Sequence, residues 1–414
     1  MAFKKAFRWA GLDDDRLAKS ARGGIEPALD NVVLILRNDP AWHDVIAHNE
    51  FSGMVTKRAT PPFEVAELGE WTDMDDARLE LWLCQHYGIR RVSESVLQRG
   101  VALAADANRY HEVKEFLNGL TWDGNHRLKV WLSAYLGAED NEYTSLVGIK
   151  YLVGAVARIM RSPMPVKVDN LIILEGAQGA GKSSAFKILF SPWFTDAAFE
   201  IGSTDGYQII RGMWGVELAE LDGFNRAEAS KSKAFFSRDQ DRYRSPYGRK
   251  PINIVRQCVF GGSVNHAAYL KDDSGNRRYW PISVGRIDLP ELAEDRDQLW
   301  AEALHEYNEG TVWHVRAAEA SLFEDAQDQR YIGDAYEEKI VAWLDGKADI
   351  ADQKKNEAST SEIMGKALHL DTGKWTLAEQ QRVGRIMARI GWKRRKVGAR
   401  ESRQWNYFRP EVEG

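Results

Sequence analysis

The sequence predicts an α/β protein with a P-loop nucleoside triphosphatase core, a mainly helical module before it and a winged-helix-like domain after it. Three observations predict this class. An apolar run at 171–174 leads directly into a glycine-rich loop and a helical pattern. Short apolar runs then alternate with helical patterns, which is typical of a sheet covered by helices. Near the C-terminus, three helical patterns precede two strand patterns. We expect four parts: a module of unknown role (1–100), a helical collar-like region (101–164), the ATPase core (165–330) and the winged-helix-like domain (331–414).

The composition predicts a cytoplasmic protein without a membrane segment. The chain has 414 residues, of which 44% are hydrophobic and 28% charged, as in ordinary soluble domains. Its net charge of −5 argues against a wholly basic nucleic-acid coat protein, although basic surfaces can still be local. Cys84 and Cys258 lie far apart in apolar runs, which indicates reduced core residues. The most apolar long segment, 143–160, contains Lys150 and Arg158 and is too charged to span a bilayer. The basic N-terminus is not followed by the apolar core of a signal peptide.

The elements before the core are mostly helical by their periodicity. Residues 31–36 fit either a strand or a buried helical turn. The apolar residues of 72–87 recur at helical spacing, and 102–117 also fits a helix. After a turn at Asp123-Gly124, helices are expected at 127–136 and 141–160. This patterning predicts no function for the first hundred residues.

The remaining elements alternate and then change character. In the core we expect strands at 171–174, 212–218, 257–261 and 280–284 and helices at 182–189, 289–307 and 317–330. The last part begins with helices at 335–344 and 359–370. A capping box at Thr376–Glu379 opens a third helix, which ends at Gly391. Two strands, 392–397 and 403–408, then follow as a hairpin, in the order of a winged helix.

The glycine-rich loop fits the pattern G-x-x-x-x-G-K-[ST] at every fixed position. Its glycines allow backbone N–H groups to point inward at phosphates, and the following helix directs its positive end toward them. Lys182 is expected to reach the β- and γ-phosphates and Ser183 to hold Mg²⁺. The loop therefore predicts ATP and Mg²⁺ as cofactors. The predicted nucleotide-binding residues are Gly176, Ala177, Gln178, Gly179, Ala180, Gly181, Lys182, Ser183 and Ser184.

Two glutamates and an asparagine after later strands are the expected partners of this loop. Glu217 and Glu220 lie on and just after the second strand. One acid would hold Mg²⁺, for which we favour Glu217, and the other would polarise the attacking water. Asn265 follows the third strand, where its amide can orient that water against the γ-phosphate. The alternatives are a solvated surface carboxylate and an ordinary turn asparagine.

Arg277 and Arg278 follow a Ser-Gly turn and form a candidate arginine finger. Such a residue stabilises charge in the transition state of phosphoryl transfer. If it acts on a neighbouring subunit, the active enzyme is an oligomer with sites at subunit interfaces. The alternative is a structural ion pair with Asp272 or Asp273.

Two basic segments are candidates for contact with DNA. In the first, cations alternate with aromatic residues such as Phe235 and Tyr243, a combination that suits single strands. The alternative is a solvated loop paired with Asp239 and Asp241. Its predicted contacts are Lys231, Lys233, Arg242, Arg244, Tyr247, Arg249 and Lys250.

The second segment lies in the C-terminal domain, where cations are interrupted by Trp392, Trp405 and Tyr407. A local basic face on an acidic protein indicates a duplex or fork contact. An intramolecular surface facing acidic residues is the alternative. The predicted contacts are Arg385, Arg389, Lys393, Arg394, Arg395 and Arg403.

Taken together, these residues resemble the virulence-associated protein E family of phage and mobile-element proteins, which are similar to superfamily 3 helicases of the AAA+ type. Four segments in this order carry the resemblance: Leu174–Ser184, Trp214–Leu221, Phe235–Gly248 and Gly275–Pro281. It implies a homo-oligomeric, hexameric ring that hydrolyses ATP at subunit interfaces and moves on single-stranded or forked DNA during replication. In many superfamily 3 proteins the two acids are adjacent, whereas here two residues separate them, so the identity of the base stays open.

The sequence leaves three functional hypotheses. The first is an ATP-dependent DNA helicase or translocase of a phage or mobile element. The second is an ATP-switched replication initiator or loader without unwinding activity, and the third is a small-molecule P-loop kinase. The N-terminal region lacks the acidic pair and histidine of a primase site, so a primase is expected to be a separate chain.

Overall fold

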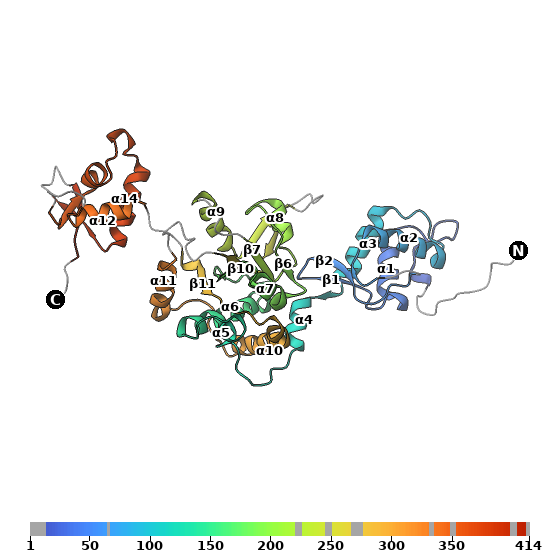
Figure 1. Cartoon of the computed structure of the whole chain (residues 1–414). Coiled ribbons are helices and arrows are strands. Elements are labelled where there is room, and N and C mark those ends of the chain that lie inside the picture. The colour runs from blue at the N-terminus through green and yellow to red at the C-terminus, as the bar shows by residue number, and fades with distance from the viewer. Residues whose placement is uncertain are drawn as a thin grey trace.

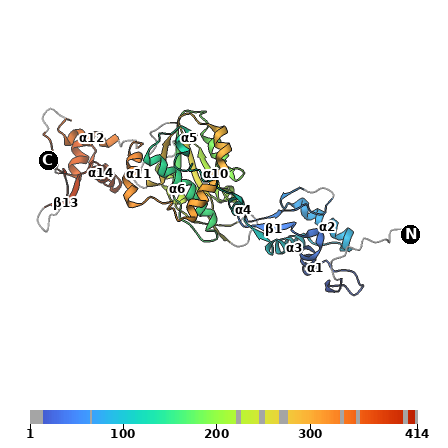
Figure 2. The same cartoon turned by 90° about the horizontal axis from the view of Figure 1, so that it is seen from below.

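The computed structural model describes residues 14–63, 67–219, 226–244, 251–265, 276–330, 335–347, 353–397 and 404–410. Its central body is a parallel sheet covered by helices, and the N-terminal and C-terminal parts lie at opposite ends of this body (Figures 1 and 2). The fold is therefore mixed α/β, as predicted. Among the described residues, no helix combines the length and the apolar character that crossing a membrane requires. Both cysteines are free; Cys258 is buried and Cys84 is partly exposed.

The N-terminal part contains a small sheet that the sequence did not predict. Its strands have the order β3-β2-β1-β4. They contain only two to four residues each, too few for a periodic pattern to stand out. Residues 31–36 lie in a helix and contribute Val32 and Ile35 to the core beside the sheet. The elements are α1 (Leu29–Asn38), β1 (Ile46–Asn49), β2 (Met54–Lys57), β3 (Gly69–Glu70), α2 (Asp73–Tyr87), α3 (Glu94–Asp106) and β4 (Arg109–Tyr110).

The single helix expected at 102–117 is wrong, because the structure has two helices there. Helix α3 ends at Asp106, and α4 (Glu112–Gly119) begins after β4. Strand β4 pairs in parallel with β1, so its backbone hydrogen bonds go to the sheet instead of to a helix. The side chain of His111 then caps α4 by accepting a hydrogen bond from the Lys114 backbone N–H. The local helical pattern gave no sign of this long-range pairing.

The central sheet has five parallel strands in the order β11-β5-β10-β7-β6. Four of them are the predicted core strands, with ends shifted by a few residues. Val264 of β10 lies opposite Glu175 of β5, so the loops that follow these two strands meet at one edge of the sheet. The strands are β5 (Leu171–Glu175), β6 (Phe194–Thr195), β7 (Gly215–Ala219), β10 (Val259–Val264) and β11 (Tyr279–Ser283).

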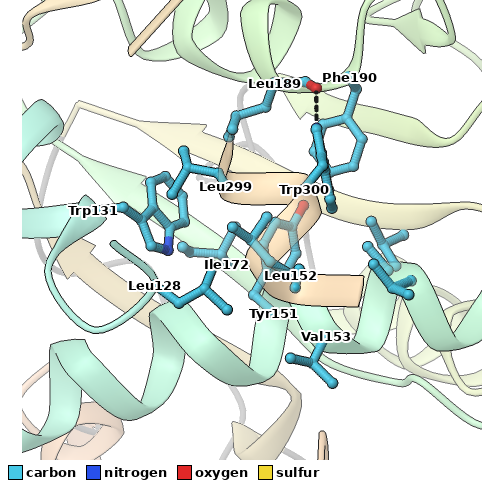
Figure 3. Packing of buried hydrophobic residues seen from close by; sticks show 14 of the residues in the cluster. Leu128, Trp131, Tyr151, Leu152, Val153, Ile172, Leu189, Phe190, Leu299 and Trp300 are labelled. Atoms are coloured by element: carbon cyan, nitrogen blue, oxygen red, sulfur yellow. Dashed lines mark hydrogen bonds between the residues drawn. The ribbon is translucent and has the colours of Figure 1, made fainter. Parts of the chain in front are cut away.

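One face of this sheet shares a large core with helices that precede β5, follow β5 and follow β11 in the sequence. Trp131, Leu152, Ile172 and Leu299 meet in this core, and the Trp300 indole donates a 2.8 Å hydrogen bond to the Leu189 carbonyl (Figure 3). Each such fully buried side chain contributes about 1.5–3 kcal/mol of burial free energy. The helices are α5 (Trp131–Leu136), α6 (Glu142–Met160), α7 (Lys182–Phe190), α10 (Leu289–Asn308) and α11 (Ala320–Asp328).

The other face carries a second core, which includes Ile173, Val216, Phe235 and Phe260. Elements on either side of β7 in the sequence contribute to it. They are α8 (Thr204–Ile209), which precedes β7, then α9 (Arg226–Phe236) and an antiparallel hairpin of β8 (Gln240–Tyr243) and β9 (Ile252–Val255). The first candidate DNA segment therefore includes part of a packed helix.

The C-terminal part has its own core, which includes Ile340, Trp343, Val383 and Met387. Helical segments and the hairpin lie where the sequence predicted them, and the hairpin gains a third strand in the order β12-β14-β13. The winged-helix assignment stays a prediction. The elements are α12 (Ala335–Leu344), β12 (Glu357–Ser359), α13 (Thr360–Glu362) with a π-helical turn at Ile363–Ala367, α14 (Leu377–Arg389), β13 (Lys393–Val397) and β14 (Gln404–Phe408).

Candidate nucleotide-binding site

A tight loop, residues 176–181, joins the end of β5 to the first residue of α7. We call it the glycine loop. Gly179 and Gly181 have φ values of +78° and +93°, a left-handed conformation that residues with a Cβ rarely adopt. The sequence therefore requires glycine at these positions for the sharp change from strand to helix. The resulting arrangement places the N-terminus of α7 directly behind the loop.

Lys182, the first residue of α7, lies over the glycine loop and is only 6% exposed. Its ammonium donates hydrogen bonds to the Gly176 carbonyl at 2.7 Å and the Ala177 carbonyl at 2.9 Å. The amide oxygen of Asn265 lies 3.4 Å from the same ammonium. Asn265 directly follows β10, the parallel neighbour of β5, which explains why a residue so distant in sequence reaches the loop. Two residues predicted separately are thus brought together.

Ser183 contacts a second predicted residue, Glu217 of β7. Its hydroxyl donates a 2.7 Å hydrogen bond to Glu217 Oε1. Glu217 is 2% exposed, and its Oε2 is buried without a hydrogen-bond partner among the described residues. Burial raises the pKa of the Glu217 carboxyl above its ordinary value, although the Ser183 hydrogen bond acts in the opposite direction. Ser183, Ser263 and Lys182 therefore compensate the charged form only in part, because burial outweighs them.

The oxygens of Ser183 and Glu217 fit a small divalent cation. Both are hard donors, and the unpartnered Glu217 Oε2 is the kind of atom that a cation would satisfy. Within the described ranges, no group of three or more His, Cys, Asp or Glu side chains could hold a metal ion. A cation here would therefore take its other ligands from phosphates and water, which is the usual situation of Mg²⁺. Glu220, the other predicted acid, lies outside the described residues.

The sequence model of the virulence-associated protein E-like domain matches residues 117–332. The chain belongs to this family. The resemblance stated from the four sequence segments is thereby confirmed. No curated protein matches this chain.

Three of the solved structures that resemble the chain over most of its length are of the C-terminal region of NrS-1. The A-form apo structure of that region has a TM-score of 0.45 at 12% identity and covers 88% of this chain and 95% of that chain. Another A-form apo structure has a TM-score of 0.42 at 12% identity, with coverages of 70% and 77%. A further apo structure has a TM-score of 0.42 at 11% identity, with coverages of 88% and 95%.

Within the virulence-associated protein E-like domain, the two candidate finger arginines lie far from the glycine loop of their own chain. They precede Tyr279 of β11, which pairs with Leu171 at the start of β5, whereas the loop follows the end of β5. Leu171 and Glu175, the two ends of β5, are four residues apart, so about 13 Å of strand separates them. Arg277 and Arg278 therefore lie at the opposite edge of the sheet from Lys182, and any action on a nucleotide requires a second copy of the chain.

The two arginines also differ in their surroundings. Arg277 is exposed. Arg278 Nε donates a 2.7 Å hydrogen bond to the Ser237 hydroxyl and lies 3.8 Å from Asp169 Oδ2. Ser237 and Asp169 therefore hold Arg278 within its own chain, whereas the ion-pair partners suggested by the sequence, Asp272 and Asp273, lie outside the described residues. Arg277 is the better candidate finger on this geometry.

Sequence reasoning missed one ionic contact beside the glycine loop. Glu175, the last residue of β5, is 4% exposed and accepts two-pronged hydrogen bonds of 3.0 to 3.1 Å from the Arg330 guanidinium. The Ser283 hydroxyl donates to the same carboxylate at 2.8 Å. A charged residue at the end of an otherwise apolar strand was the available signal. This contact fixes the strand end that precedes the loop to Arg330, which follows α11.

The first predicted DNA segment divides between exposed and buried residues. Lys231, Arg242 and Arg244 are exposed, as a DNA contact requires. Lys233 is only 8% exposed, so its prediction as a DNA contact is corrected: helix α9 turns it toward the protein. Phe235 and Tyr243, read as faces for bases, are also buried in the core at 2% and 7% exposure. Tyr247, Arg249 and Lys250 lie outside the described residues.

The second predicted DNA segment is exposed along β13, from Lys393 to Lys396. The Arg394 guanidinium lies 4.7 Å from the ring centre of Trp405, which is 44% exposed. Arg385 is exposed as well. Arg389 lies 3.9 Å from Glu337 Oε1, so part of its charge is compensated within the protein. Arg403 lies outside the described residues.

Proposed function

We propose that this chain is a Mg²⁺-dependent, DNA-stimulated ATPase that acts as a helicase or translocase in the replication of a phage or other mobile element. The observation that carries the proposal is the contact of Ser183 with the buried Glu217, next to Lys182 on the glycine loop. Family membership supports the link to mobile elements through the resemblance set out above.

The residues of the chain divide the work of binding and hydrolysing ATP. The glycine loop and the N-terminus of α7 present N–H groups to the phosphates. Lys182 exchanges its bonds to the Gly176 and Ala177 carbonyls for bonds to β- and γ-phosphate oxygens. Ser183 and Glu217 would hold Mg²⁺, which neutralises charge on the phosphates when it is bound. Asn265, beside Lys182, positions the attacking water, and Glu220 or Glu217 polarises it.

The position of Arg277 supports an oligomeric enzyme. In one chain it lies at the edge of the sheet away from its own glycine loop and is exposed, so it is available to the nucleotide of a neighbouring copy. A closed ring gives every site one such neighbour. We propose a hexameric ring on the resemblance, with single-stranded or forked DNA contacted by the β8–β9 hairpin and by β13.

The test is steady-state ATP hydrolysis with and without single-stranded DNA, together with strand displacement from a forked duplex. Wild type and Lys182→Ala are compared. Stimulation by DNA and displacement that depends on Lys182 would support the motor. Hydrolysis without displacement would favour the initiator or loader, and hydrolysis indifferent to DNA would favour a small-molecule kinase.

A further inference from the structure

The β8–β9 hairpin presents two different faces. Asp241 and Tyr243 of β8 are buried against the second core, whereas Arg242, between them, is exposed. Strands β8 and β9 pair over Gln240–Tyr243 and Ile252–Val255. The inner face therefore fixes the hairpin to the ATPase core, and the outer face carries the cation offered to DNA under the proposed function.

A buried ion pair closes the base of this hairpin. The Arg256 guanidinium binds both carboxylate oxygens of Asp241, with 2.8 Å between Arg256 Nε and Asp241 Oδ2. It also donates to the Phe235 carbonyl and lies 4.3 Å from the Phe235 ring centre. The side chains of Arg256 and Asp241 are 1% and 7% exposed. A buried ion pair gains little stability over well-packed apolar residues, but its two-pronged geometry fixes orientation.

A second buried arginine holds the backbone of Arg256. Arg158 of α6 is 1% exposed and donates to the Arg256 carbonyl at 3.1 Å and to the Val168 carbonyl at 2.6 Å. Helix α6 belongs to the main core, so the backbone at Arg256 is fixed to the body of the ATPase. The base of the hairpin, at Arg256, therefore has little freedom to move independently of the central body.

Strand β10 connects this point to the nucleotide site. It begins at Val259, just after Arg256, and pairs in parallel with both β5 and β7. It ends at Val264, and the next residue is Asn265, whose amide lies beside Lys182. One continuous, doubly paired strand therefore has the hairpin base at its start and a nucleotide-facing residue at its end.

We infer that the Arg256–Asp241 pair couples the nucleotide site to the β8–β9 hairpin, as positioning residues that transmit DNA contact to ATP hydrolysis through β10. The inference rests on the proposed function. It assigns neither residue to contact with ATP or with DNA. Because energetic coupling is reciprocal, the same pair would let bound nucleotide alter the hairpin.

The experiment measures ATP turnover of the full chain without DNA and at saturating oligo(dT). Asp241→Asn keeps the shape of the side chain and removes its charge. DNA-free turnover should stay within about twofold of wild type, whereas the stimulation factor should fall to about one because the coupling is lost. Undiminished stimulation in Asp241→Asn would overturn the inference. A wild type that DNA does not stimulate would overturn the proposed function as well.

Two variants separate coupling from other losses. Asp75→Asn breaks a buried ion pair of similar exposure, with Lys57 in the N-terminal part, and should keep full stimulation. Arg242→Gln should raise the DNA concentration needed for half-maximal stimulation, whereas Asp241→Asn should lower the maximum itself. If Asp75→Asn loses stimulation equally, the effect is general destabilisation and the inference fails.

A measurement on wild type covers the case that Asp241→Asn does not fold. A non-hydrolysable ATP analogue should change hydrogen exchange at the hairpin amides, residues 240–243 and 252–255. Strand β1, 46–49, serves as the reference and should not change. If hydrogen exchange at the hairpin amides is the same with and without the ATP analogue, the inference fails.

Discussion

The substitution Glu217→Gln tests the site with two effects of opposite sign. In the protein without nucleotide, Glu217 is 2% exposed, and one of its oxygens has no hydrogen-bond partner among the described residues. A buried polar group left unpaired costs about 1–3 kcal/mol, and more when it is charged. Glutamine keeps the shape and the Ser183 hydrogen bond and removes the charge. We expect a gain of about 1 kcal/mol, which raises the unfolding temperature by about 2–4 °C for a unit of 150–250 residues.

The same substitution should reduce catalysis. With Mg²⁺ and ATP bound, the carboxylate is expected to face positive charge, so the amide loses an interaction that the charged form makes. Losing one preorganised electrostatic contact costs about 10²–10³ in kcat, or about 2.7–4 kcal/mol. A residue whose removal stabilises the empty protein and inactivates the enzyme is one whose charge is kept for function.

Calorimetry and phosphate release measure the two effects. A Mg²⁺-ATP analogue should shift the transition of the central body in wild type, and this shift should shrink in Glu217→Gln. Glu302→Gln is the matched control, since Glu302 is also 2% exposed but accepts hydrogen bonds from the Arg127 and Leu128 backbone N–H groups. It should lose about 1–2 kcal/mol. A lower unfolding temperature in Glu217→Gln, or full turnover, would refute the reasoning.

The pH dependence follows from the raised pKa of Glu217. The folded protein holds this proton more tightly than the unfolded chain, whose carboxyl titrates near 4.5. Stability therefore falls as pH rises from about that value through the raised pKa, and the penalty is fully present above it. Glu217→Gln should lack this part of the slope. Equal slopes in wild type and variant would contradict the assignment of the shift to burial.

Three further outcomes are expected. Lys182→Ala should lower turnover by about 10²–10³ without preventing folding, measured by phosphate release and calorimetry; normal turnover would remove Lys182 from the site. Arg277→Ala should lose turnover with unchanged stability, whereas Arg278→Ala should also lose about 1 kcal/mol through its contacts with Ser237 and Asp169. Replacing Arg394 and Arg395 with Gln should make the slope of log K for DNA binding against log salt concentration shallower by about 1.4–1.8, because two phosphate contacts are lost. Anisotropy titrations measure this slope. An unchanged slope would remove β13 from the DNA contact.

The sequence predicted the parts of the fold whose causes are local. The run at 171–174 is apolar at every position because β5 is buried on both faces, and the glycines of the loop after it permit a tight turn. Lys182 and Ser183 were inferred from the loop motif, and Glu217 and Asn265 from their places at the ends of strands. Their convergence follows because parallel strands bring such positions toward one region of a sheet.

The errors arose where a tertiary contact decided the outcome. Residues 102–117 have the spacing of one helix, and only pairing of β4 with β1 breaks it. In α9, the alternation of cations and aromatics suggested a DNA-contacting segment. The buried positions Ser232, Lys233, Phe235 and Phe236 instead form one helical face, a pattern that three- and four-residue spacing would have revealed.

The two edges of the central sheet explain why one chain does not complete the proposed site. Lys182 and Asn265 meet at the edge where β5 and β10 end. Arg277 lies at the other edge, where β11 begins, and the register of β11 against β5 leaves no way to bring it to the same loop without unpairing the strands. Mixing two inactive variants tests this directly. A mixture of the Lys182→Ala and Arg277→Ala proteins should regain part of the turnover, because some interfaces then join an intact glycine loop to an intact arginine. If every mixture stays inactive although the two variants assemble together, Arg277 does not act across the interface.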